Sequence, residues 1–157
     1  MIFVLHTEHS PELILKSFTD DDFRRFTFGK ENNILVKETI VGTDIQKRMF
    51  FVRKENSVPE TIKKITGVGD VEFEINETIN LNNYRDVSLF EVQNKNLNLF
   101  NIKGKRFIYK NDDGKTVVKY ELNVNTRFGK ICKYFIEKSY KKSQIDYFNM
   151  MSEFYTN

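Results

Sequence analysis

An alternation of apolar and polar residues is the clearest pattern in the second half of the chain. In residues 71–81, VEFEINETINL, most odd positions are apolar and most even positions are glutamate or asparagine. Residues 115–126, KTVVKYELNVNT, alternate in the same way. A period of two sends successive side chains to opposite faces of a sheet, so each stretch predicts a strand with one buried face.

Five further apolar stretches predict strands, and with the two above they make seven. They cover residues 2–8, 33–41, 45–55, 86–92 and 97–110. Gly104 lies inside the last of these stretches, where a glycine is typical of a β-bulge. The segment NDDG at residues 111–114 predicts a tight hairpin between the last two strands.

Helix signals follow the first predicted strand, interrupt the series of strands at residues 57–66 and follow the last strand. Ser10 before Pro11 predicts a helix start, and the pair Thr19 and Asp22 resembles a capping box that begins a second short helix. Residues 57–66 predict a short helix or an ordered loop. Residues 130–154 contain neither proline nor glycine and predict one long helix that follows the last strand directly across a glycine.

A length of 157 residues favours a single domain that covers residues 1–157. The net charge is +3, from 25 basic and 22 acidic side chains, which is too balanced for a typical nucleic-acid-binding protein, so no nucleic acid is expected. A single cysteine excludes an intrachain disulfide, and no stretch reaches the roughly 20 apolar residues of a membrane span. The absence of a signal peptide pattern at the N-terminus favours a cytoplasmic location.

The order of these elements resembles the helix-grip fold of the START-like, Bet v 1-like (SRPBCC) superfamily. The stretches HSPELILKSFTDDDFRR, VPETIKKITGVGDVEFEINETI and VNTRFGKICKYFIEK carry the resemblance, the last two to a functionally uncharacterised bacterial branch of it. The resemblance implies an α+β fold in which a seven-stranded curved antiparallel sheet wraps around a long C-terminal helix. It also implies a hydrophobic cavity, which in the superfamily frequently holds lipids, sterols or polyketides and in some members carries out cyclase or hydrolase chemistry.

Two glutamates interrupt the inward apolar pattern of their strands. Glu77 is in phase with Phe73 and Ile75, and Glu38 is in phase with the apolar positions of residues 33–41. A carboxylate that faces a cavity can orient a polar ligand end, or act as an acid or base with a raised pKa. The alternative is a solvated position near a rim of the sheet. Arg48 and Arg106 are possible partners for these carboxylates.

Our leading hypothesis is a non-catalytic protein that binds an apolar or amphipathic, lipid-like small molecule between the sheet and the last helix. The ligand-binding residues that we predict are Glu38, Phe73, Ile75, Glu77, Tyr120, Leu122, Phe135 and Ser139. Two alternatives stay open: an enzyme of cyclase or hydrolase type that uses a cavity carboxylate, and an interaction module whose cavity is filled by its own aromatic side chains. No catalytic residue is assigned, and the oligomeric state cannot be inferred.

Other candidate sites have simpler explanations. His6 and His9 lack a third ligand nearby, and no P-loop, GxGxxG or HExxH motif is present, so no metal or cofactor is predicted. Lysines interleave with tyrosine and phenylalanine in KICKYFIEKSYKK, residues 130–142. Such a stretch suits contact with an anionic lipid surface or RNA, whereas the simpler interpretation is the solvated edge of a packed helix.

Overall fold

The computed structural model describes residues 1–30, 44–82 and 88–156 and shows an α+β fold. In chain order the elements are β1 (Ile2–Thr7), α1 (Pro11–Thr19), α2 (Asp21–Lys30), β2 (Ile45–Lys54), α3 (Glu60–Thr66), β3 (Val71–Asn80), β4 (Ser88–Asn94), β5 (Phe100–Lys110), β6 (Thr116–Thr126) and α4 (Gly129–Tyr155).

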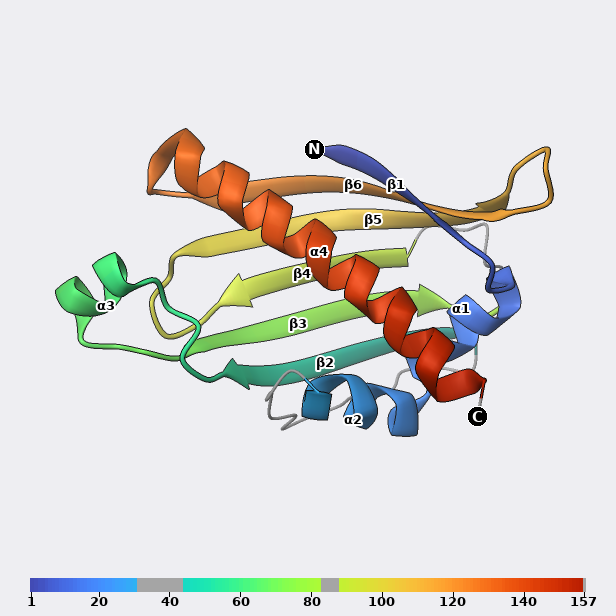
Figure 1. Cartoon of the computed structure of the whole chain (residues 1–157), viewed down its shortest axis with the longest axis horizontal. Coiled ribbons are helices and arrows are strands. Elements are labelled where there is room, and N and C mark those ends of the chain that lie inside the picture. Colours follow the sequence, from blue (N-terminus) through green and yellow to red (C-terminus); the bar gives the residue numbers. More distant parts are fainter. Residues whose placement is uncertain (31–43, 83–87, 157) are drawn as a thin grey trace.

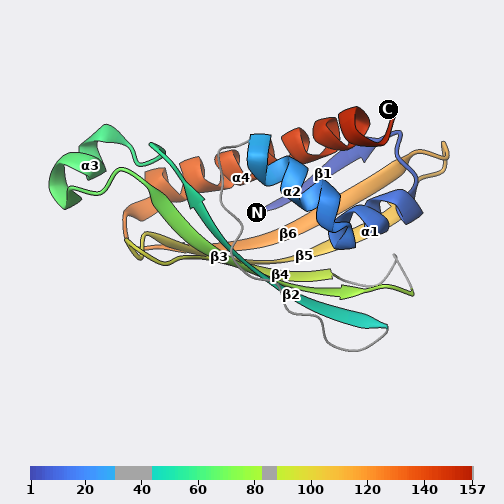
Figure 2. The same ribbon diagram turned by 90° about the horizontal axis from the view of Figure 1, so that it is seen from below.

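One antiparallel sheet forms the body of the fold, with strand order β1-β6-β5-β4-β3-β2. Strands β2 to β6 follow one another as neighbours, and β1 pairs with β6, so β1 and β2 are the two outer strands of this order. The helix α4 runs diagonally across one face of the sheet, and α1 and α2 lie on the same side near its C-terminal end (Figures 1 and 2). We call this covered side the inner face.

The described residues contain six strands, whereas the sequence predicts seven. The difference is the strand expected at residues 33–41, which lies outside the described residues. The other six predicted strands are confirmed with shifts of a few residues at their ends. The curved antiparallel sheet with a long C-terminal helix is therefore confirmed with six strands in the described ranges, and the seventh strand stays a prediction.

Local sequence explains how the helices begin. The Ser10 side chain accepts a hydrogen bond from the Leu13 amide (3.1 Å), which confirms the predicted start of α1. The predicted pairing of Thr19 with Asp22 is wrong, because Asp20 accepts from the amides of Asp22 and Phe23 and caps α2 instead. Gly129 begins α4 with a φ of 84°, a left-handed conformation that glycine adopts without steric cost.

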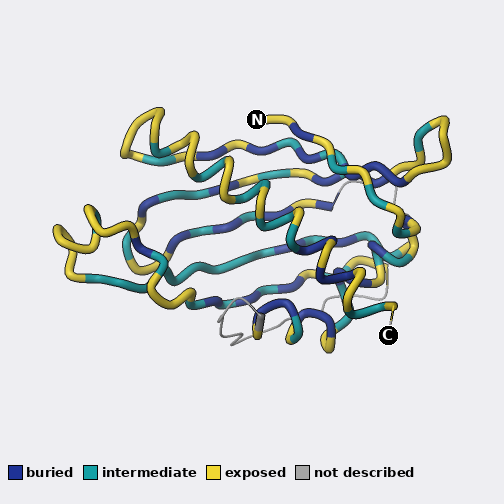
Figure 3. The backbone as a smooth tube through the Cα atoms, viewed as in Figure 1, coloured by how far each residue is buried: buried dark blue, intermediate teal, exposed yellow. Residues whose placement is uncertain are grey.

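Aromatic rings fill the space between the sheet and the C-terminal two thirds of α4. Phe3 stacks on Tyr120 with ring centroids 4.6 Å apart, and Phe90 stacks on Tyr140 at 5.5 Å. Figure 3 shows that buried residues follow the strands and the second half of α4, while α3 and the first turns of α4 are mostly exposed. The core is therefore concentrated at the end of the molecule where α1 and α2 lie.

Gly104 does not form the predicted bulge. Its pairing continues without interruption to Phe90 on β4 and to Leu122 on β6. A Cβ atom at this position would lie 2.3 Å from the Phe90 ring and 2.9 Å from the Glu121 carbonyl oxygen. The glycine is needed because the Phe90 ring lies directly against the backbone of β5.

Replacing Gly104 with alanine should therefore lower the free energy of unfolding by about 1–3 kcal/mol, the usual cost of overpacking a core. Gly29 in α2 is the matched control, because a Cβ atom added there would meet nothing within 4 Å and an alanine should leave stability unchanged or raise it. Chemical denaturation measures both. Equal stabilities of Gly104→Ala and the wild-type protein would contradict the proposed close approach.

Candidate functional site

A buried carboxylate with two arginine partners lies on the inner face beside α1 and α2. Glu77 on β3 accepts hydrogen bonds from Arg24 of α2 (2.8 and 3.1 Å) and from Arg106 of β5 (2.7 Å). All three residues are nine-tenths or more buried. The prediction that Arg106 is a partner of Glu77 is thus confirmed. The alternative, in which Glu77 is exposed to solvent at a rim of the sheet, is wrong.

A third arginine joins this network from β2. Arg48 lies directly opposite Glu77 in the backbone pairing of β2 with β3. Its side chain donates hydrogen bonds to the Phe18 carbonyl oxygen (2.8 Å) and to the carboxylate of Asp21. Arg24 Nε also donates to the Phe18 oxygen (3.4 Å). Because Phe18 lies in the last turn of α1, the arginines satisfy a terminal carbonyl and fix α1 and α2 to the sheet.

The ion pairs decide the charge of Glu77. Burial by itself would raise the pKa of Glu77, but attraction to Arg24 and Arg106 and the hydrogen bond from Arg106 outweigh it and lower the pKa below its ordinary value of 4.5. The carboxylate is ionised at neutral pH and its lone pairs are directed to guanidinium groups. These properties suit a structural anion and not a proton-transferring base with a raised pKa.

Aromatic rings enclose Arg106. Its guanidinium carbon lies 4.1 Å from the centroid of Phe18 and 5.3 Å from that of Phe90. One terminal nitrogen donates to Glu77 and to Ser88 (3.1 Å), but Nε has no hydrogen-bond partner within the described parts of the chain. A buried donor without an acceptor is costly, and a ligand oxygen would satisfy it.

Half-buried apolar side chains occupy the opposite end of the inner face. Phe73 and Ile75 of β3, Phe100 of β5 and Ile136 of α4 pack against the main core without being fully covered. Phe73 and Ile75 also contact the smaller cluster of Phe28, Phe50 and Val52. This group, Phe73, Ile75, Phe100 and Ile136, is called the apolar end below.

The predicted ligand-binding residues fall into three groups. Phe73, Ile75 and Glu77 lie together on the inner face of β3. Tyr120 and Leu122 are buried on β6, and the Tyr120 hydroxyl donates to Gln144 of α4 (3.0 Å). Whether any of these residues contacts a ligand stays a prediction.

Two of the remaining predicted residues, Ser139 and Phe135, are not brought to this site. Ser139 is exposed, and Phe135 is 60% exposed on a side of α4 that turns away from the core-facing Ile136. These two therefore lie apart from the buried network. Glu38 lies outside the described residues.

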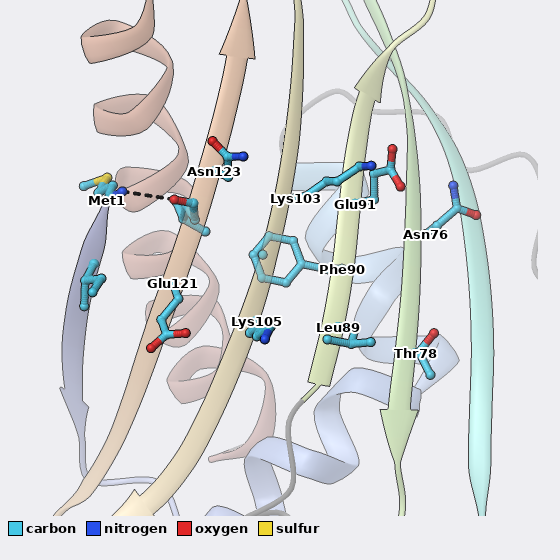
Figure 4. A pocket seen from close by; sticks show the side chains of 13 residues that line it. Met1, Asn76, Thr78, Leu89, Phe90, Glu91, Lys103, Lys105, Glu121 and Asn123 are labelled. Atoms are coloured by element: carbon cyan, nitrogen blue, oxygen red, sulfur yellow. Dashed lines mark hydrogen bonds between the residues drawn. The ribbon is translucent and has the colours of Figure 1, made fainter.

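A hollow of about 720 Å³ lies on the outer face of the sheet, opposite α4 (Figure 4). Lys103, Lys105, Glu91 and Glu121 surround it with charges of both signs. The hollow is open to solvent and its rim is polar. It is therefore distinct from the predicted apolar cavity between the sheet and the helix.

Arg24 is the network member that sequence reasoning did not single out. It follows Phe23 in a short helix rich in charged residues, where an arginine is normally solvated. The signal that could have identified it is the need of a buried glutamate for more than one cationic partner. The face of α2 that turns toward β3 could not be inferred without the tertiary arrangement.

Comparisons with known proteins support the fold. No protein-family model and no curated protein sequence matches the chain. The crystal structure of the Zhui aromatase/cyclase from Streptomyces sp. R1128 superposes with a TM-score of 0.62 at 8% identity, covering 96% of this chain and 89% of that one. The structure of TTHA0849 from Thermus thermophilus has a TM-score of 0.56 at 12% identity, with coverage of 98% and 94%. At these identities the likeness concerns the helix-grip type of fold alone.

The described residues offer neither a cluster of metal ligands nor a membrane-spanning helix. Within residues 1–30, 44–82 and 88–156, no three histidine, cysteine or acidic side chains are grouped as metal ligands would be. No helix in the same ranges is long and apolar enough to span a bilayer.

Replacing Glu77 with glutamine should lower the free energy of unfolding by about 3–5 kcal/mol at neutral pH, because Arg24 and Arg106 would lose their counter-charge. The pKa of Glu77 is lower in the folded protein than in the unfolded chain. Its contribution is therefore present above pH 4.5 and is lost as the pH falls through the folded-state pKa. The stability difference between the wild-type protein and Glu77→Gln should shrink on acidification.

Denaturant titrations between neutral and acidic pH test this expectation. Glu121→Gln is the matched control, because Glu121 lies on the outer face beside the partly exposed Lys119, and the loss of this pair should change stability little at any pH. A stability difference for Glu77→Gln that stays constant down to acidic pH would contradict the ion-pair account.

Proposed function

We propose that the protein binds an amphipathic small molecule with an anionic group on the inner face of the sheet. The apolar part of the ligand would lie on the apolar end, under the first half of α4. Burial of apolar surface at about 25 cal/mol per Å² would supply most of the affinity. The anionic group would be held by the arginine network, and the observation that carries this proposal is the buried Arg106 with its unmatched Nε donor.

The balance of charge favours an anion over a cation. Two buried guanidinium groups, those of Arg24 and Arg106, share one carboxylate, that of Glu77, within the described residues. These three side chains together carry one net positive charge in a region of low solvent access. A carboxylate of the ligand would balance this charge and form a strong, charge-assisted hydrogen bond. Glu77 acts in this account by orienting the arginines and does not itself contact the ligand.

The Phe90–Tyr140 stack separates the two parts of the proposed site. Inward positions of β5 run from Phe100 through Ile102 and Gly104 to Arg106, and the Phe90 ring lies at Gly104. A ligand on the apolar end reaches Arg106 only when this stack moves. Stacking of two rings contributes roughly 0.5–1.5 kcal/mol in addition to the burial of their surface. The binding free energy of an anion of moderate affinity can offset this amount.

A second candidate is an interaction module that holds no ligand. The aromatic packing of Phe3, Phe90, Tyr120 and Tyr140 favours it, because these rings already occupy the space beside the network. In that case the arginines serve only to fix α1 and α2. The two candidates differ in whether the inner face accepts an anionic probe.

A pair of fluorescent probes, a long-chain fatty acid and its methyl ester, distinguishes the candidates. We expect the acid to bind at least roughly tenfold more tightly, since one charge-assisted hydrogen bond contributes about 1.5–3 kcal/mol. Arg106→Gln should abolish this preference and leave binding of the ester in place. Lys105→Gln is the control, because Lys105 is the adjacent residue of β5 and lines the hollow on the outer face.

Circular dichroism and unfolding curves establish that Arg106→Gln is folded before binding is compared. Should this variant fail to fold, the preference of the wild-type protein for the acid over the ester remains a sufficient test. Equal affinity for the two probes would overturn the proposed anion site. No binding of either probe would overturn the proposal as a whole and favour the module without a ligand.

A further inference from the structure

The first turns of α4 carry apolar side chains on two different sides. Ile136 and Tyr140 face the core, whereas Ile131, Tyr134 and Phe135 are 75%, 60% and 60% exposed. The three exposed residues recur at helical spacing, and the rings of Tyr134 and Phe135 contact each other edge to face at 5.7 Å. No packing within the described chain accounts for large apolar side chains on this outer side.

Lysines flank this surface. Lys130, Lys133 and Lys138 lie within the same turns and are exposed, with Glu137 as the only acidic residue between Gly129 and Lys138. We call the six residues Lys130, Ile131, Lys133, Tyr134, Phe135 and Lys138 the basic aromatic face.

A second exposed helix lies at the same end of the molecule. Figures 1 and 2 both place α3 and the start of α4 at one end of the long axis. No residue of α3 is buried, Ile65 is 85% exposed, and Lys63 and Lys64 precede it. Two separate helices thus present lysines together with apolar side chains at one end.

We infer that the basic aromatic face docks on an anionic membrane surface. Exposed aromatic and aliphatic side chains enter the boundary between headgroups and acyl chains, and lysines are attracted to anionic headgroups. A second copy of the chain is a poorer partner, because two such faces would bring lysines against lysines. A fluid bilayer also needs no shape complementarity to two separate helices. The inference does not depend on ligand binding to the inner face.

Co-sedimentation with lipid vesicles tests the inference. The full chain should bind vesicles of phosphatidylcholine and phosphatidylserine, mixed at roughly 3:1, at least roughly tenfold more tightly than pure phosphatidylcholine vesicles. Raising the salt from about 0.1 M to about 0.5 M should remove most of this difference, because the lysines act through screened attraction.

Two matched pairs of variants locate the contact. The double variant Ile131→Ser, Phe135→Ser should reduce vesicle binding at least roughly tenfold. The control double variant Ile2→Ser, Leu89→Ser changes exposed apolar residues on another part of the surface and should leave vesicle binding unchanged. Replacing Lys130, Lys133 and Lys138 by glutamine should remove the preference for phosphatidylserine. The same change at Lys103, Lys105 and Lys110 of β5 should preserve it.

Three results would overturn the inference. The first is equal binding to the two kinds of vesicle, and the second is an equal loss of binding in the control variants. The third is an absence of vesicle binding. A dimer that the double variant Ile131→Ser, Phe135→Ser disrupts would then assign the face to a second copy, and binding to a single-stranded oligonucleotide would assign it to a nucleic acid.

Discussion

The ionised Glu77 in the core is the constraint on which the inner face depends. A carboxylate buried in this way is tolerated only when cationic groups surround it, and Arg24 and Arg106 supply them from a helix and a strand far apart in sequence. The same requirement fixes the position of α2 against the sheet and, through the Phe18 carbonyl, the end of α1. Fold and candidate site therefore share one network.

The charge of this network determines which ligands the inner face can bind. Arg24 and Arg106 share one carboxylate, so the buried group of Arg24, Arg106 and Glu77 carries one net positive charge. The excess charge lies beside an apolar region, a combination that matches an amphipathic anion. The lowered pKa of Glu77 removes the main support for the alternative of a carboxylate that transfers protons.

The sequence predicted most of the architecture because periodicity and caps are local signals. Alternation identified β3 and β6, and Gly129 identified the junction between β6 and α4. Two predictions from the sequence are wrong. Gly104 makes room for the Phe90 ring, a contact between strands that the sequence does not reveal, and does not form a bulge. Asp20 caps α2 in place of Thr19. Glu77 could be recognised as inward-facing by phase, but Arg24 could not, because the orientation of a short helix follows from tertiary packing.

Side-chain NMR of the arginine Nε–H groups during titration with a long-chain fatty acid shows whether Arg106 receives the anionic group. We expect the Arg106 Nε–H resonance to shift to low field and to become protected from exchange as the acid saturates the protein, while the exposed Arg25 does not respond. An Arg106 resonance that stays unchanged while the acid binds would be incompatible with a ligand held by the arginine network, because the anionic group would then lie elsewhere.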